Sequence, residues 1–165
     1  MKNVYEHTRT VGITESPEFQ KKQLANHALN VGLLCGHGCK YCSTAALLRR
    51  NNVFKSIGMS SFEALQAGIA IVDPSTPTRA IKQAKKLKPN DTVMLSTTTD
   101  PYAPEAQTHN LGRQCAMAVL ENSQASLRVL TKNKAVSKDL DLFAAYRDRV
   151  MLGLSVTSPV SKENI

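Results

Sequence analysis

The chain has 165 residues and is 42% hydrophobic, which suffices for one globular core and excludes a fibrous or wholly disordered protein. Its 21 basic and 13 acidic residues give a net charge of +8, which favours anionic partners such as nucleic acid, although scattered lysines are also typical of solvated helix faces. The longest apolar runs are far shorter than the ~20 residues that span a bilayer, and the polar start does not resemble a secretory signal, so we expect a cytoplasmic protein.

The first half of the chain predicts an extension followed by a strand and two short helices. Residues 1–26 are polar with no clean period, so we expect an amino-terminal extension, with the folded core in 27–165. The apolar run 28–35 predicts a buried strand that leads directly into a cysteine-rich loop. A short helix is expected over 43–50, and a second should begin at Ser60, which forms a capping box with the glutamate three residues later.

The second half of the chain alternates helices and strands. The segment 73–77, with prolines at 74 and 77, predicts an interruption of regular secondary structure. Apolar spacing and turn signals then predict helix 78–87, strand 92–96, helix 104–122, strand 127–131, helix 137–147 and strand 150–156.

Strands separated by helices imply right-handed crossovers and a parallel sheet, with active residues on the loops after the strands. Four strands cannot close an eight-stranded barrel, and another helix would be expected after the fourth. The pattern therefore predicts an α/β fold, a partial (β/α) barrel truncated after its fourth strand.

The segment CGHGCKYC places Cys35, Cys39 and Cys42 in a C-x3-C-x2-C spacing. Three cysteines within eight residues of a chain without a secretory signal favour metal binding over disulfides. Thiolates are the usual ligands of iron–sulfur clusters, and a glycine-rich loop allows closely spaced sulfurs to converge. Three thiolates would leave one iron of a [4Fe-4S] cluster open to another ligand.

This spacing, with the aromatic Tyr41 just before the last cysteine, resembles the signature of the radical S-adenosylmethionine (SAM) superfamily. The resemblance implies a barrel of the radical SAM type. It also implies that the open iron binds SAM and that reductive cleavage yields a 5′-deoxyadenosyl radical, with electrons from a donor such as flavodoxin or ferredoxin.

Three segments are similar to the spore photoproduct lyase-like branch of that superfamily. They are GHGCKYC at 36–42, STTTDPY at 96–102 and VLTK at 129–132. Spore photoproduct lyases carry a hydrogen-donating cysteine where this chain has Thr97, so repair of the spore photoproduct is not implied. The resemblance favours lyase-like chemistry and leaves the substrate open, with nucleic acid as one candidate.

The resemblance also implies contacts with SAM. Lys132 would pair with the SAM carboxylate, Thr99 and Asp100 would lie near the methionine end, Ser155 would approach the ribose, and Tyr41 would lie against the adenine. A lysine ammonium suits a carboxylate, and hydroxyl groups suit sugar oxygens.

Other interpretations of these residues stay open. The three cysteines and His37 are also a ligand set for structural zinc, which makes a non-catalytic metal-binding module the competing hypothesis. The turn that contains Asp100 is also a helix-capping signal. Cys115 lies on the apolar face of its expected helix, which predicts a buried core residue.

Overall fold

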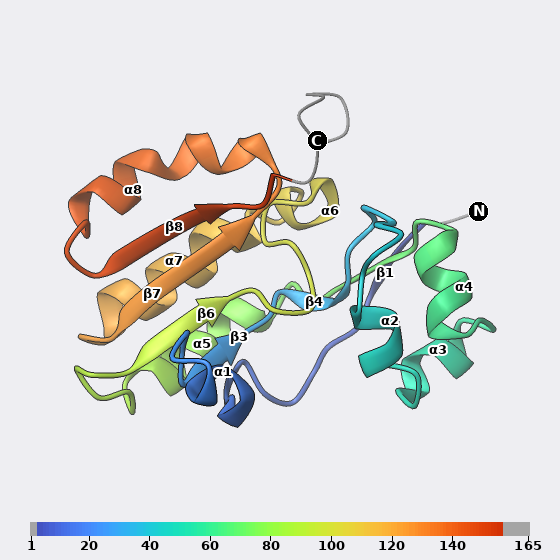
Figure 1. Ribbon diagram of the computed structural model, residues 1–165, viewed down its shortest axis with the longest axis horizontal. Coiled ribbons are helices and arrows are strands. Elements are labelled where there is room, and N and C mark those ends of the chain that lie inside the picture. Colours follow the sequence, from blue (N-terminus) through green and yellow to red (C-terminus); the bar gives the residue numbers. More distant parts are fainter. Residues whose placement is uncertain (1–2, 157–165) are drawn as a thin grey trace.

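Two β-sheets organise residues 3–156, the part of the chain described in a computed structural model (Figure 1). The five-stranded sheet has the spatial order β2-β3-β6-β7-β8, and the three-stranded sheet has the order β1-β5-β4. The larger sheet contains β2 Ile13–Glu15, β3 His27–Leu29, β6 Thr92–Leu95, β7 Ser126–Thr131 and β8 Val150–Leu154. The smaller sheet contains β1 Val4–Glu6, β4 Gly32–Leu34 and β5 Ala70–Val72.

Helices connect and cover the strands, which makes the fold mixed α/β. They are α1 Pro17–Lys21, α2 Thr44–Leu47, α3 Asn52–Ser56, α4 Ser61–Gln66, α5 Thr76–Ala84, α6 Pro104–Gln107, α7 Leu111–Asn122, the 3-10 helix η1 Lys134–Asp139 and α8 Leu140–Ala145. No helix within residues 3–156 combines the length and the apolar character that a membrane crossing requires.

The parallel order β3-β6-β7-β8 confirms the expected alternation of four strands with helical connections. Strand β7 shows why the periodicity was informative, because Leu127 and Val129 are buried while Leu130, on the opposite face, is exposed. Helices α5 and α7 pack against each other, and α7 also packs on β6 and β7. The buried faces of these elements form the larger hydrophobic core.

The smaller sheet and helices α2, α3 and α4 form a second region beside the parallel sheet (Figure 1). Its separate core includes Leu34, Phe54 and Ile71. Strand β5 belongs to both cores, because Ile71 packs in the smaller one and the next residue, Val72, packs in the larger one. This alternation follows from the two-residue period of a strand.

The single strand predicted over 28–35 is wrong. The chain forms β3, leaves the larger sheet at Asn30, and forms β4 in the smaller sheet before it reaches Cys35. Strand β4 pairs antiparallel with β5, which sequence periodicity did not predict. The cysteine loop therefore follows a strand of the smaller sheet, β4, although β3, the strand before β4 in the chain, belongs to the larger sheet.

The prediction that residues 1–26 contribute no core element is also wrong for the described residues. Strand β1 pairs in parallel with β5, β2 pairs antiparallel with β3, and Ile13 is part of the larger core. The main-chain N–H of Arg9 donates to Asp73 at 2.9 Å, which ties this segment to the end of β5. The proposed division into 1–26 and 27–165 stays a prediction, and 157–165 lie outside the described residues.

Several helix boundaries differ from those expected, while one is confirmed. The helix predicted over 104–122 is divided into α6 and α7, because Asn110 adopts a left-handed conformation with φ 50° that a continuous helix does not allow. The chain break predicted at 73–77 ends earlier, since α5 begins at Thr76. The capping box of α4 is confirmed, with Ser60 and Glu63 each accepting from the other's backbone N–H.

Candidate functional site

A cavity of about 250 Å³ lies at the carboxyl ends of the parallel strands, where the cysteine loop meets β6, β7 and β8. It brings together the three cysteines and all five residues implied as SAM contacts. The lining residues are Cys35, His37, Cys39, Tyr41, Cys42, Ser43, Thr44, Ser96, Thr97, Thr98, Thr99, Asp100, Leu130, Thr131, Lys132 and Ser155.

The cysteine loop curls tightly between β4 and α2. Gly38 has φ 61°, a conformation that glycine adopts without strain, and the N–H of Cys42 donates to the carbonyl of Cys39 at 3.0 Å. All three cysteines are half-buried and unbridged. Burial raises the pKa of the Cys35 thiol to about 12, although the backbone amides of His37 and Asp100 act in the opposite direction.

Lys132 reaches the cysteine loop from the end of β7. Its Nζ lies 3.1 Å from Cys39 Sγ, donates to the Tyr41 hydroxyl and sits 4.9 Å from the centre of the Tyr41 ring. Burial alone would lower the pKa of Lys132, but the contacts with Tyr41 and Cys39 raise it above its ordinary value. A charged ammonium therefore lies at the mouth of the cavity, beside one of the proposed cluster ligands.

Asp100 holds the strand ends in place. Its carboxylate accepts from the Thr131 hydroxyl at 2.6 Å, the Tyr102 N–H at 2.9 Å and the Lys132 N–H at 3.0 Å. Burial would raise the pKa of Asp100, but the neighbouring His37 and these hydrogen bonds keep it below its ordinary value. The bond to Tyr102 closes a local turn but does not cap a helix, because α6 begins at Pro104 and its N-cap residue, Ala103, receives no side-chain cap. The helix-capping interpretation of Asp100 is therefore wrong, while contact of Asp100 with SAM stays a prediction.

His37 lies deep in the cavity, with its side chain only 11% exposed. Its Nε2 is 3.4 Å from Asp100 Oδ2 but is not aligned for a hydrogen bond, and it has no hydrogen-bond partner among residues 3–156. Thr99 Oγ1 is also buried and finds no partner in that part of the chain. Since buried polar atoms are normally satisfied, these two side chains suit a ligand that brings its own polar groups.

Asn30 organises the loop after β6 and was missed in the sequence. Its Oδ1 accepts from the N–H groups of Thr97 at 2.6 Å and Thr98 at 2.9 Å, while Thr44 Oγ1 donates to the Thr98 carbonyl at 3.0 Å. Thr97 is thus a loop residue that is held by a hydrogen bond to Asn30 and lines the cavity. Its position in the sequence could have indicated the role of Asn30, because Asn30 directly follows a strand, β3, whose carboxyl end lies at the site.

The remaining predicted contacts line the cavity to different degrees. Tyr41 is 65% exposed, so one side of its ring is open to solvent. Ser155 follows β8, where its N–H donates to the carbonyl of Thr131 at 2.8 Å and so keeps it next to Lys132. Their contacts with the adenine and the ribose stay predictions.

The donor set suits an iron–sulfur cluster in its chemistry, since three thiols line one cavity beside the His37 imidazole and a lysine. Across residues 3–156, however, no three cysteine, histidine, aspartate or glutamate side chains are arranged as a ready metal site. The residues that would hold a cluster are Cys35, Cys39 and Cys42, and a zinc ion would add His37.

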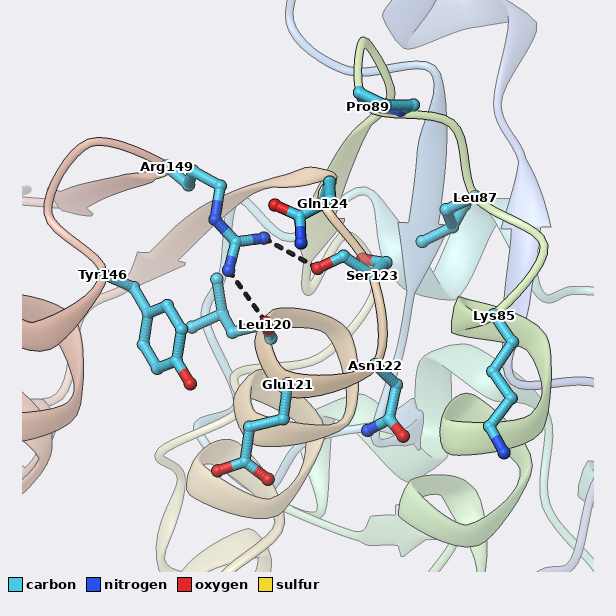
Figure 2. A pocket seen from close by; sticks show the side chains of 10 residues that line it. All are labelled: Lys85, Leu87, Pro89, Leu120, Glu121, Asn122, Ser123, Gln124, Tyr146 and Arg149. Carbon is cyan, nitrogen blue, oxygen red and sulfur yellow. Dashed lines mark hydrogen bonds between the residues drawn. The ribbon is translucent and has the colours of Figure 1, made fainter.

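Two features lie outside this cavity. Cys115 is fully buried in the larger core, as its place in the helical pattern predicted. A larger hollow of about 790 Å³ lies at the opposite, amino-terminal ends of the strands (Figure 2). Its Arg149 donates to the carbonyls of Leu120, Ser123 and Ala125, which gives that arginine a structural role at the end of α7.

Comparisons with known proteins give one informative similarity. No family model matches the chain, and no solved structure matches it. The uncharacterized protein ORF301 of Acidianus two-tailed virus is 31% identical over 135 residues, which cover 79% of this chain and 42% of the viral protein. The chain thus spans less than half the length of that relative, whose name describes no activity.

Proposed function

We propose that this chain is part of a radical SAM enzyme of the spore photoproduct lyase-like branch, folded as a partial (β/α) barrel. The supporting observation is the shared cavity, because residues from four separate segments, selected by sequence resemblance, all line it. The parallel order β3-β6-β7-β8 suits such a barrel and places the cavity at the carboxyl ends of the strands.

In this proposal Cys35, Cys39 and Cys42 hold a [4Fe-4S] cluster, which supplies the electron that cleaves SAM into methionine and a 5′-deoxyadenosyl radical. Lys132 orients the SAM carboxylate through its ammonium group, which already lies against Cys39. Asp100 positions Lys132 through the backbone N–H of that residue. An electron donor such as flavodoxin or ferredoxin is the expected protein partner.

The hydroxyl-rich wall of the cavity would bind the rest of the cofactor. Thr99 has a buried hydroxyl that no side chain or backbone group of residues 3–156 satisfies, and Ser155 lies beside Lys132 at the end of β8. Tyr41 offers an exposed aromatic ring at the mouth. Hydroxyls bind the oxygens of a ribose, and an aromatic ring stacks on a purine. The net charge of +8 makes nucleic acid a candidate substrate.

Reconstitution with iron and sulfide under anaerobic conditions tests the metal assignment. We expect about four irons and four sulfides per chain in the wild type. Replacing any one of Cys35, Cys39 or Cys42 by alanine should abolish cluster assembly. Cys115→Ala is the matched control, because that cysteine is buried in the larger core and should not affect loading. Unchanged iron and sulfide in the three loop variants would refute the assignment.

The competing function is a metal-binding module without turnover. One observation favours it: His37 lines the same cavity as the three cysteines, and its Nε2 has no hydrogen-bond partner within the described residues. Stoichiometric zinc without sulfide would establish that alternative. If the cluster assembles, an assay for 5′-deoxyadenosine with SAM and dithionite separates the two functions: product supports the enzyme, and its absence with an intact cluster supports the inert module.

A further inference from the structure

Glu105 is a buried carboxylate that contacts the cysteine loop. It lies on α6, the short helix after β6, and is only 9% exposed. Its Oε1 accepts a hydrogen bond of 2.8 Å from the backbone N–H of Gly36, which is 69 residues away in the sequence. Gly36 directly follows Cys35, so the bond fixes the backbone beside the first of the three cysteines.

Close packing holds Gly36 against Glu105. A Cβ atom at position 36 would lie 3.3 Å from the carbonyl oxygen of Gly68, 3.5 Å from Glu105 Oε2 and 3.7 Å from the Cβ of Ala70. The loop backbone is therefore enclosed between the start of β5 and the carboxylate.

The negative charge of Glu105 is weakly compensated. Within residues 3–156, no lysine, arginine or histidine forms an ion pair with it, and the Gly36 amide is its only described hydrogen-bond donor. Burying a carboxylate with so little compensation costs free energy.

We propose that Glu105 is the positioning residue of the cysteine loop, which holds the Gly36 amide in place and sets a negative charge beside Cys35. The first part of this inference, the positioning of Gly36, does not depend on the proposed function. The second part, the electrostatic one, rests on the proposed function: the charge of Glu105 lowers the reduction potential of the cluster that Cys35 holds. Reduction adds negative charge to a cluster, so a carboxylate nearby disfavours the reduced state.

Two substitutions separate the hydrogen bond from the charge. Glu105→Gln keeps a carbonyl oxygen for the Gly36 amide and removes the charge, whereas Glu105→Ala removes both. Glu121→Gln is the matched control, because Glu121 is exposed on α7. Urea unfolding of all variants identifies any variant that fails to fold.

Amide hydrogen exchange in the metal-free protein tests the first part. In Glu105→Ala the Gly36 amide should exchange on the order of tenfold faster or more, since bonds to charged acceptors are worth at least that factor. Glu105→Gln should retain most of the protection, and Glu121→Gln should retain all of it. Unchanged exchange of Gly36 in Glu105→Ala would overturn the positioning role.

The reconstituted protein tests the second part. Glu105→Ala should bind iron roughly 10 to 100-fold more weakly, as is typical when a group that supports metal ligands is lost. Glu105→Gln should assemble the cluster with a reduction potential shifted to a more positive value, measured by dye-mediated titration. An unchanged or more negative potential in Glu105→Gln would overturn the electrostatic part.

The two proposals fail in distinguishable ways. If the wild type binds no iron and sulfide, the cluster function and the electrostatic part fall together, while the exchange of Gly36 still decides the positioning role. If the wild type assembles the cluster and Glu105→Ala matches it in Gly36 exchange and iron affinity, only the inference about Glu105 falls.

Discussion

The parallel-sheet region and the cysteine-loop region differ in how they are built. The first has strands of up to six residues and the helices α5 and α7, of nine and twelve residues, which share one extended core. The second has strands of three residues and helices of four to six around a smaller core. The candidate site needs both regions, because the thiols come from the second and Lys132 comes from the first.

This difference teaches that the site depends on the contacts that join the two regions. Arg9 and Arg79 both pair with Asp73, at the end of the strand shared by the two cores. Nearer the cavity, the junction includes the bond from Gly36 to Glu105, the bond from Thr44 to the carbonyl of Thr98, and the contacts of Lys132 with the cysteine loop. The following predictions test how far the regions depend on one another.

Removing the junction carboxylate should have the largest effect. The Asp73 side chain is fully buried, pairs with Arg9 and Arg79, and accepts from the Ser75 hydroxyl at 2.8 Å. Asp73→Ala would leave two largely buried guanidinium groups without their partner, and should cost about 3–5 kcal/mol of unfolding free energy. Urea denaturation measures the loss, with the exposed Asp148→Ala as control, expected within about 0.5 kcal/mol of wild type.

A matched pair of leucines compares the two cores directly. Leu34 in the smaller core and Leu127 in the larger one are each 1% exposed. Substitution by alanine should cost about 2–5 kcal/mol, with Leu127→Ala at the upper end because we expect the longer strand and helix around it, β7 and α7, to collapse less into the cavity. Urea unfolding gives the two values, and a larger cost for Leu34→Ala would contradict the ranking.

Acid should weaken the same junction. Burial raises the pKa of Asp73, but bonds from Arg9 and Ser75 and the charges of both arginines bring it below its ordinary value of 3.8. Because the pKa of Asp73 is lower in the native state than in the unfolded state, its ionised form stabilises the fold fully at pH values above the ordinary pKa of 3.8. This contribution is lost as the pH falls from there through the native pKa. Stability measured from pH 5 to pH 2 should fall more steeply in the wild type than in Asp73→Asn; parallel curves would exclude this source.

Arg149 tests the parallel-sheet region away from the junction. Its guanidinium donates to the carbonyls of Leu120 at 2.8 Å and Ser123 at 2.9 Å, as Figure 2 shows, and also to the carbonyl of Ala125 at 3.1 Å. Arg149→Ala leaves these groups at the end of α7 without a donor and should cost about 1.5–3 kcal/mol. Calorimetry measures the loss, and iron loading should stay unchanged, since Arg149 lies at the opposite end of the strands.

Lys132 should have the smallest effect on stability. Lys132→Ala removes an ammonium at the cavity mouth and should change unfolding free energy by no more than about 0.5 kcal/mol. SAM affinity should nevertheless fall roughly tenfold or more, because the carboxylate loses a charged donor. Titration of the reconstituted protein with SAM measures this change. Equal affinities would remove Lys132 from the proposed site.

Local patterns predicted the parallel-sheet region well and the cysteine-loop region poorly. Strand β7 and helix α7 were recognisable because their buried residues recur with the period of the element. Strand β5 has only three residues, all buried, and shows no period. In the cysteine-loop region a reliable signal came from Ser60 and Glu63, whose capping box depends on residues only three apart.

The sequence by itself determined the alternation of strands and helices, the spacing of Cys35, Cys39 and Cys42, and the burial of Cys115. The tertiary structure alone decided that the chain crosses to a second sheet at Asn30, that Arg9 pairs with Asp73, and that Glu105 holds Gly36. The physical reason is the separation of the interacting residues along the chain. Periodicity and spacing arise from near neighbours in the sequence. The contacts of Arg9 with Asp73 and of Glu105 with Gly36 instead join residues more than 60 positions apart, and they depend on how the sheets and helices pack.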